Sequence, residues 1–220
     1  MFLISGASYR PLKRFIDICG SLFVILLLSP LFIWTACKVR KNLGRPVIFK
    51  QIRPGLNEMP FTNYKFRSMR DTYDANGDPL SDSERLTPFG EFLRASSLDE
   101  LPELWNVLRG DMSLVGPRPL LVSFLPLFSE NDARRHSVRP GITGLAQING
   151  RNEMTWQKRI EYDIDYVKHI SLALDMKIIW RTLRPVMHKS GINSDKGKTI
   201  ITPPAEIKRP DILKKLGYEK

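Results

Sequence analysis

A long apolar run near the start of the chain constrains its architecture more than any other sequence feature. Residues 15–37 read FIDICGSLFVILLLSPLFIWTAC, and a transmembrane helix needs about 20 such residues. Pro30 follows Ser29 inside this run. Because proline lacks an N–H group and its ring clashes with the carbonyl four residues back, at Leu26, a helix must kink or break here.

Charge on both sides of the run favours a helix that enters the membrane and returns. Basic residues stand before and after it: Arg10, Lys13, Arg14, Lys38, Arg40, Lys41 and Arg45. Since positive flanks stay on the cytoplasmic side, a turn at Ser29 and Pro30 keeps both flanks there. A helix that simply crosses the membrane is the alternative interpretation. Asp17 also argues against a plain span. A cleaved signal peptide is disfavoured, because no small-x-small cleavage site follows.

The rest of the chain reads as short strands and amphipathic helices. The predicted elements are two strands within 46–70 with a turn at Pro54, Gly55 and Asn57, a polar loop at 71–88, helices over 89–109 that meet near Ser97, a glycine-rich loop from Arg139 to Arg151, and two helices over 155–189. The apolar face of the last helix can pack on the core or rest on the bilayer. Cys19 and Cys37 are expected to be buried free thiols.

The charge balance points to an anionic partner. The chain has 34 Lys and Arg against 23 Asp and Glu, a formal net charge of +11. Such a surplus suits phosphate groups, nucleic acid or an acidic membrane surface. No zinc-finger spacing, basic zipper or aromatic RNA signature accompanies it. We therefore expect no nucleic-acid partner.

The acidic pair Asp99 and Glu100 opens a predicted amphipathic helix. One interpretation is structural: Ser97 and Glu100 form a capping box, or Asp99 is the N-cap, which places Pro102 in the first turn, where no donor is needed. The other interpretation is chemical, because a carboxylate in the positive field of a helix start stays ionised and available as a nucleophile. The residues alone do not decide between them.

Several cationic and polar residues suit phosphate binding. Arg118 stands between Pro117 and Pro119, which hold its backbone extended, and arginine is suited to bidentate phosphate contact. The other candidates are Lys65, Arg94, Gln147 and Arg151. An anionic nucleophile can attack a diphosphate only where cations, and usually a divalent metal, neutralise the phosphoryl oxygens.

These motifs together resemble the bacterial sugar transferases, also called monotopic polyprenyl-phosphate phosphoglycosyl transferases, and in particular their small PglC-like members. The resemblance runs from about Leu12 to Ser190. It rests on six segments: Ser29-Pro30, Tyr64-Lys65-Phe66-Arg67, Ser97-Leu98-Asp99-Glu100-Leu101-Pro102, Gly110-Asp111-Met112-Ser113, Gly116-Pro117-Arg118-Pro119, and Arg139 through Arg151.

The resemblance implies a two-step reaction. The aspartate that matches Asp99 attacks the β-phosphate of a UDP-sugar, and UMP leaves. The sugar is expected to be an acetamido sugar. Polyprenyl phosphate then takes the sugar phosphate from the enzyme. Glu100 assists, Mg2+ is required near Asp99, and substrate is bound by Lys65, Arg94 and Arg118, with Gln147 and Arg151 as weaker candidates. The membrane helix breaks at the Ser-Pro pair.

The predicted fold class is therefore α+β, with an N-terminal re-entrant membrane helix and a mainly helical cytoplasmic catalytic domain that includes a small β-hairpin or sheet. We expect the membrane helix with its basic flanks at 1–41, the catalytic domain at 42–190, and a polar, basic C-terminal tail at 191–220. The expected location is the bacterial inner (cytoplasmic) membrane, with the catalytic domain on the cytoplasmic face.

The expected activity is the first membrane step of glycan assembly, in polysaccharide biosynthesis or protein glycosylation. The partners are a UDP-sugar, polyprenyl phosphate and the membrane, and a homodimer and downstream glycosyltransferases are left open. Two rival functions stay open as well. One is a non-catalytic basic membrane adaptor that binds anionic lipid, and the other is a nucleotide-diphosphate-sugar hydrolase that needs no lipid acceptor.

Overall fold

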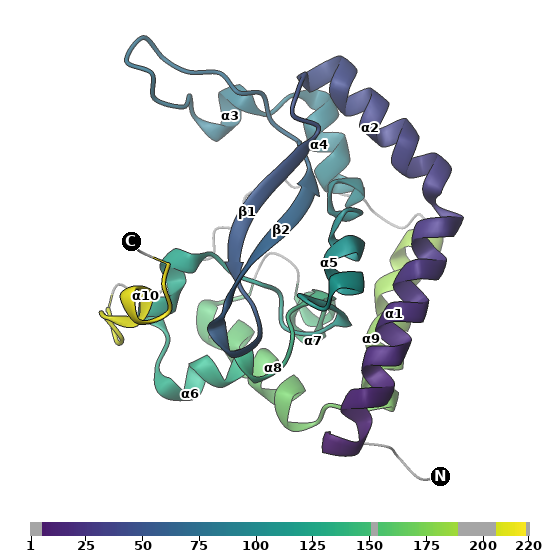
Figure 1. Cartoon of the computed structure of the whole chain (residues 1–220), viewed down its shortest axis with the longest axis vertical. Coiled ribbons are helices and arrows are strands. Elements are labelled where there is room, and N and C mark those ends of the chain that lie inside the picture. The colour runs from purple at the N-terminus through teal and green to yellow at the C-terminus, as the bar shows by residue number, and fades with distance from the viewer. Residues whose placement is uncertain (1–5, 151–153, 189–205, 219–220) are drawn as a thin grey trace.

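Two helices joined at a sharp bend form one edge of the protein (Figure 1). The computed structural model describes residues 6–150, 154–188 and 206–218. Helix α1 (Tyr9–Leu27) follows a short 3₁₀ turn, η1 (Gly6–Ser8), and meets α2 (Ser29–Leu43) at 65°. Pro30 lies in the first turn of α2, where its missing N–H group costs no hydrogen bond. The predicted break at Ser29 and Pro30 is confirmed.

The bent pair carries an apolar surface of its own. Among the described residues, no single helix is long and apolar enough to cross a membrane, but α1 and α2 taken together meet that test of length and composition. Large apolar side chains are exposed along both helices: Phe15, Ile18, Leu22, Phe23, Leu26, Leu27, Ile33 and Trp34. Cys19 and Cys37 are free, as expected, but exposed, so their predicted burial is wrong.

A β-hairpin runs through the middle of the molecule, with α1 and α5 (Glu103–Arg109) on one side of it (Figure 1). Strand β1 (Ile48–Pro54) pairs antiparallel with β2 (Pro60–Phe66), and the two are joined by the 3₁₀ turn η2 (Leu56–Glu58). The predicted strands and turn are confirmed.

The glycine-rich segment contains regular structure that the sequence did not indicate. Strand β4 (Gly141–Thr143) pairs in parallel with β3 (Ser113–Val115), and α7 (Leu145–Asn149) follows. A Cβ atom on Gly141 would lie 2.0 Å from the amide nitrogen of Gly116, so only glycine allows this approach. This glycine therefore allows two backbone segments to pack closely against each other.

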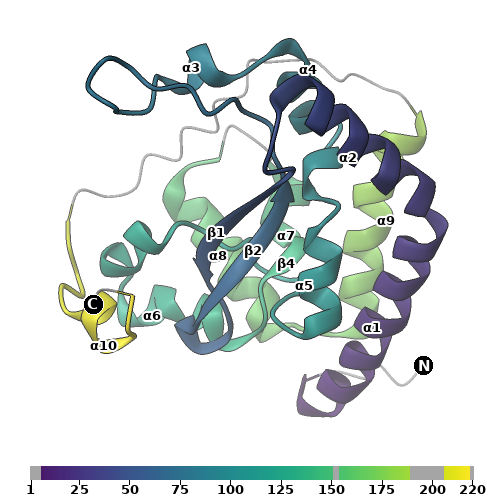
Figure 2. The ribbon, with the colours of Figure 1, turned by 45° about the horizontal axis from the view of Figure 1, so that its top comes forward.

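The two predicted C-terminal helices are α8 (Trp156–Lys168) and α9 (Leu172–His188). Helix α9 runs beside α1 (Figures 1 and 2), and Asp175 joins the two because it accepts hydrogen bonds from Tyr9 Oη at 2.7 Å and Lys13 Nζ at 2.5 Å. One face of α9 buries Ile178, while Trp180 on the other face is 63% exposed. The helix thus has both a core face and an exposed apolar face.

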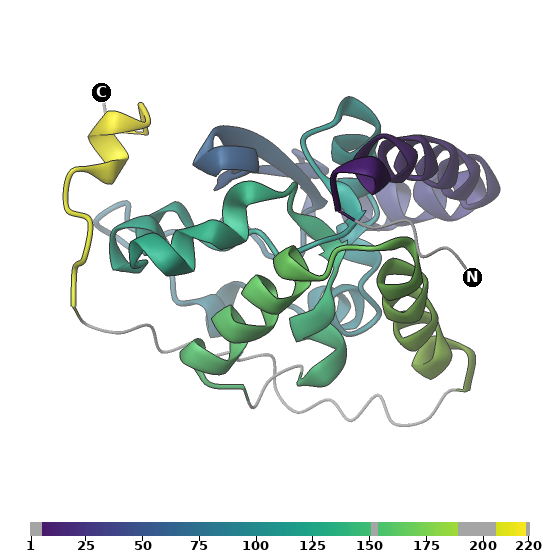
Figure 3. The same ribbon diagram turned by 90° about the horizontal axis from the view of Figure 1, so that it is seen from below.

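Shorter helices complete the molecule: α3 (Asp82–Arg85), α4 (Pro88–Ala95), η3 (Leu98–Glu100), η4 (Val122–Leu127), α6 (Glu130–Ala133), η5 (Arg134–Ser137) and α10 (Ile212–Lys215). Figure 3 shows α10 at the far side of the molecule from α1. Its Ile212 and Leu213 pack against the cluster that contains Phe128 and Trp156.

Candidate active site

The acidic pair lies on the 3₁₀ turn η3, between α4 and α5. Ser97 enters this turn in the left-handed region, with φ 56° and ψ 18°, a conformation that is strained for a residue other than glycine. Helix α5 begins only at Glu103, with Pro102 at its N-cap position and no side-chain cap. Both capping predictions, through Ser97 and through Asp99, are therefore wrong.

Glu100 is fixed by two cations from distant parts of the chain. Its Oε1 accepts a hydrogen bond of 2.6 Å from Lys65 Nζ at the end of β2, and its Oε2 lies 3.3 Å from Arg118 Nη1. Burial raises the pKa of Glu100, but Arg118 and Lys65 outweigh burial and bring the pKa to about 2. Glu100 is therefore ionised at neutral pH.

Asp99 has the opposite environment. Its side chain is buried, with 8% of the residue exposed, and its carboxyl group makes no hydrogen bond or ion pair with any part of the chain that the structure describes. Burial and the neighbouring Glu100 raise its pKa to about 6, although Lys65 and Arg118 act against this. Asp99 is the carboxylate of the cluster that is left free to react.

Glu103 is a member of the cluster that the sequence analysis missed. It is 2% exposed, its Oε1 lies 3.2 Å from Lys65 Nζ, and the same oxygen accepts a hydrogen bond of 3.0 Å from Asn63 Nδ2. The signal was its spacing of three residues from Glu100, which places two carboxylates near one face of a helix. Lys65 thus lies between two acids.

The neighbouring Asn106 fastens α5 to the hairpin. Its Oδ1 accepts from Tyr64 N at 3.1 Å, and its Nδ2 donates to the carbonyl oxygen of Thr62 at 2.7 Å. Because Asn106 is fully buried, these bonds fix the position of β2 relative to the helix that follows the acidic pair. The position of Lys65 depends on this contact.

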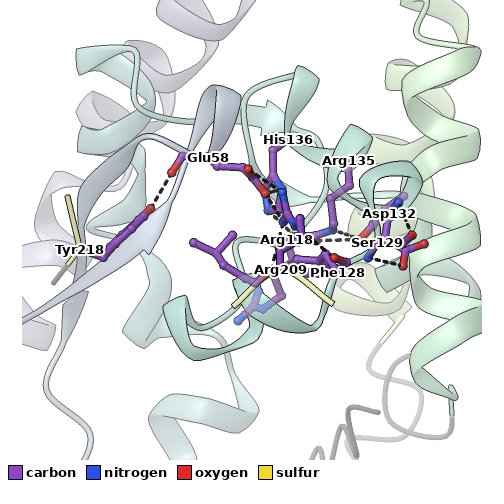
Figure 4. Close-up of polar contacts among 11 residues, drawn as sticks. Glu58, Arg118, Phe128, Ser129, Asp132, Arg135, His136, Arg209 and Tyr218 are labelled. Carbon is purple, nitrogen blue, oxygen red and sulfur yellow. Dashed lines mark hydrogen bonds and ion pairs between the residues drawn. The ribbon is translucent and has the colours of Figure 1, made fainter. Parts of the chain in front are cut away.

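Arg118 is held from its backbone as well as its side chain. The amide of Gly141 donates to the carbonyl oxygen of Pro117 at 3.0 Å, and Arg135 Nη2 donates to the carbonyl oxygen of Arg118 at 2.7 Å. Arg135 is 1% exposed and also binds Asp163 Oδ2 at 2.7 Å. Arg118 is therefore oriented by buried neighbours (Figure 4).

The remaining candidates have other side-chain partners or lie outside the described residues. Arg94 is exposed, and its Nε donates to Ser68 Oγ at 3.0 Å. Gln147 Nε2 donates to the carbonyl oxygen of Ile142 at 2.9 Å, and its buried Oε1 has no partner among the described residues. Arg151 lies outside the described residues. The structure brings together Lys65, Glu100 and Arg118 beside Asp99.

The carboxylate of Asp99 also fits a magnesium ion that binds together with a phosphate-containing substrate. Among the described residues, no group of three or more His, Cys, Asp and Glu side chains could hold a metal by itself. Magnesium commonly takes one or two carboxylates and completes its shell with water and substrate phosphate. Since Glu100 is occupied by two cations, Asp99 is the carboxylate that fits this pattern.

Comparison with known proteins agrees with the resemblance seen in the sequence. The family model described as bacterial sugar transferase matches residues 8–189. The uncharacterized sugar transferase EpsL of Bacillus subtilis is 52% identical over 181 residues, which cover 82% of this chain and 90% of that protein.

Two larger relatives have names that state a reaction. The UDP-glucose:undecaprenyl-phosphate glucose-1-phosphate transferase of Klebsiella pneumoniae is 44% identical over 183 residues, which cover 78% of this chain and 39% of that protein. The undecaprenyl-phosphate galactose phosphotransferase of Salmonella typhimurium is 38% identical over 206 residues, with 86% and 43% covered. The chain spans less than half the length of these two proteins. By the family match and by its likeness to EpsL, the chain belongs to the bacterial sugar transferase family.

Proposed function

We propose that this chain transfers a sugar 1-phosphate from a UDP-sugar to polyprenyl phosphate and releases UMP. The observation that carries the proposal is the carboxylate of Asp99, which has no partner among the described residues and stands beside Glu100, which binds both Lys65 and Arg118. The names of the larger relatives give the same reaction class for those proteins.

The proposed reaction has two displacements at one phosphorus atom. In the first, a carboxylate oxygen of Asp99 forms a bond to the β-phosphorus, and the bond from that phosphorus to the bridging oxygen breaks, so UMP leaves with the electron pair. In the second, a phosphate oxygen of the polyprenyl phosphate bonds to the same phosphorus. The bond to Asp99 then breaks, and its carboxylate is restored.

Lys65 and Arg118 would neutralise the phosphoryl oxygens during both steps. Positive groups held in place before the reaction cost no reorganisation when charge develops. Glu100, whose pKa is about 2, is ionised at neutral pH and has no proton to give. Its assistance is therefore the orientation of the two cations. Magnesium, when bound at Asp99, would supply further charge neutralisation.

The membrane location follows from the lipid acceptor and the bent helix pair. We propose that α1 and α2 enter the inner membrane and return to the cytoplasmic face, with their exposed apolar side chains in the lipid.

The donor sugar is a separate question. The acetamido sugar implied by the resemblance is to be tested beside UDP-glucose and UDP-galactose, since relatives are named for transfer of glucose 1-phosphate and galactose.

The test compares wild type with Asp99→Asn in nanodiscs with magnesium, first without polyprenyl phosphate and then with it. UMP release is measured with each UDP-sugar, and a β-phosphorus label on the donor reports any phosphosugar trapped on the protein. Asp165→Asn is the matched control, because Asp165 is exposed and, among the described residues, its side chain pairs with His169 alone. Without lipid acceptor, we expect label on wild type and on the control but not on Asp99→Asn. Addition of the acceptor should then remove the label from the protein.

The rival functions give different results in the same assay. A hydrolase releases UMP and free sugar phosphate in multiple turnovers without lipid. An adaptor releases no UMP with any donor, and its binding follows lipid charge and salt. Full activity of Asp99→Asn would contradict the proposed covalent step.

A further inference from the structure

The C-terminal segment 206–218 lies beyond the region matched by the family model, which ends at residue 189, yet it is tied into the domain by one arginine. Arg209 binds Glu58 with both ends of its guanidinium group, at 2.6 Å from Nη2 to Oε1 and 3.0 Å from Nη1 to Oε2. Its Nε and Nη2 also donate to the carbonyl oxygens of Phe128 and Leu125, each at 3.1 Å. Four hydrogen bonds to one side chain define a specific contact (Figure 4).

Glu58 receives two further contacts at the tip of the hairpin. Its backbone is in the left-handed region, at φ 63°, and its carbonyl oxygen accepts a hydrogen bond of 2.8 Å from Tyr218 Oη. His136 Nδ1 lies 3.4 Å from Glu58 Oε1. Burial raises the pKa of Glu58, but His136 and Arg209 outweigh burial and bring it to about 2.

His136 continues the chain of contacts inward. It is 5% exposed, and burial lowers its pKa to about 4, so the imidazole is neutral at pH 7. Its Nε2 lies 3.2 Å from Arg135 Nη1. Because arginine can only donate, Nε2 must accept, and the single ring proton is then on Nδ1, the nitrogen that faces Glu58. The neutral histidine therefore lies between Glu58, whose carboxylate Nδ1 approaches without a hydrogen bond, and the guanidinium of Arg135.

Arg135 completes the path to the active site through the carbonyl oxygen of Arg118. Each link from Arg209 through Glu58, His136 and Arg135 is a direct contact between side chains that are at least 88% buried. Side chains this enclosed have few alternative positions. Loss of Arg209 would remove two hydrogen bonds that the carboxylate of Glu58 accepts, and the neighbouring contacts would have to adjust.

We infer that Arg209 is a positioning residue for the active site: it acts through Glu58, His136 and Arg135 on the backbone of Arg118. The inference rests on the proposed function, in which Arg118 contacts the diphosphate. It assigns a role in catalysis to a segment outside the family match, and it predicts that this segment and Arg118 are energetically coupled.

The test uses the full chain in nanodiscs and compares Arg209→Gln with Lys208→Gln. Both changes remove one positive charge from the same segment, but Lys208 is exposed and its side chain makes no ion pair among the described residues. Coupling through a packed network commonly changes an equilibrium or rate by about 2- to 30-fold. We expect a fall in kcat/KM of about that size for Arg209→Gln and none for Lys208→Gln, with partial recovery in Arg209→Lys.

Two further measurements separate positioning from general stabilisation. In an Arg118→Lys background the effect of Arg209→Gln should shrink to less than about 2-fold, because the path ends at Arg118. Amide hydrogen exchange at residues 116–119 and 134–137 should speed up in Arg209→Gln and not in Lys208→Gln. An equal loss in both backgrounds, or unchanged exchange at those residues, overturns the inference.

The exchange measurement also keeps this inference separate from the proposed function. If wild type releases no UMP, the proposed function fails, while exchange still reports whether Arg209 reaches Arg118. If Arg209→Gln does not fold, Arg209→Lys, which keeps the charge but loses the two-pronged contact with Glu58, goes through the same comparisons. The same pattern of exchange is then expected, and its absence overturns the inference.

Discussion

Asp99 and Glu100 are neighbours in the chain, but only Glu100 binds the cations. Glu100 pairs with Lys65 and Arg118 and has a pKa of about 2, whereas Asp99 has no partner among the described residues and a pKa of about 6. Two carboxylates whose environments separate their pKa values have different roles in many enzymes. In the proposed reaction Glu100 organises the positive charge, and Asp99, which has no partner among the described residues, forms the bond.

The raised pKa of Asp99 predicts that Asp99→Asn stabilises the protein at pH 8. The folded state holds the proton more tightly than the unfolded chain, so the cost of the charged carboxylate is absent below pH 4, grows as pH rises through 4 to 6, and is complete above pH 6. Asparagine removes this cost of about 1 to 3 kcal/mol. Denaturant unfolding at pH 8 and pH 4 measures it, and an Asp99→Asn variant that is less stable at pH 8 contradicts the assignment.

Arg118 and Arg94 should differ sharply when each is replaced by glutamine. Arg118 is part of the cluster, whereas Arg94 contacts Ser68. Loss of one group that stabilises developing charge costs about 100- to 1000-fold in rate, and we expect Arg118→Gln to approach that loss in kcat. Arg94→Gln should retain most activity. Equal losses in kcat would place Arg94 in the reaction as well.

Magnesium should bind at Asp99 in the presence of a UDP-sugar. A cation close to a carboxylate favours its charged form, so magnesium is expected to lower the pKa of Asp99 from about 6. Carboxyl NMR chemical shifts across a pH titration measure this change, and chelation with EDTA should stop UMP release while leaving the melting temperature unchanged. If the pKa of Asp99 does not change when magnesium is added, the assignment of Asp99 as a metal ligand is contradicted.

Arg135 and Asp163 form a fully enclosed ion pair whose disruption should be costly. Their side chains are 1% and 2% exposed. Removing one partner of such a pair leaves the other charge buried and unpaired, which costs about 3 to 5 kcal/mol. Asp163→Asn should lose stability on this scale in denaturant unfolding. The double variant Arg135→Met with Asp163→Leu should recover part of it, because neither member of the pair is then left without the other.

The elements predicted correctly are those with local signals. The break between α1 and α2 follows from Pro30, and the hairpin follows from two apolar runs around a Pro-Gly turn. The pairing of β3 with β4 was missed because each strand has three residues, and their contact depends on glycines far apart in sequence. Glu103 was missed for a related reason, since its partner Lys65 comes from the hairpin.

The helix caps show why local rules failed near the reactive carboxylate. Ser97 and Asp99 both suit a cap by residue type, but the chain makes a left-handed turn at Ser97 and a 3₁₀ turn before α5 begins. The left-handed conformation is unfavourable for serine and is maintained by the surrounding structure. Local preferences are expected to fail at such strained positions.

The bend at Pro30 predicts that both ends of the helix pair lie on the same side of the membrane. Cys19 and Cys37 are free and exposed, so both are first replaced by serine. Single cysteines at Arg10 and Lys41, which flank the apolar run, then report topology through a membrane-impermeant thiol reagent.

We expect both positions to react in inside-out vesicles, which expose the cytoplasmic face, and in permeabilised cells. Neither position should react in intact cells. Pro30→Leu removes the cause of the break and favours one continuous span, which should move one of the two positions to the other side. Labelling of the two positions from opposite sides in the parent protein would show that the pair crosses the membrane.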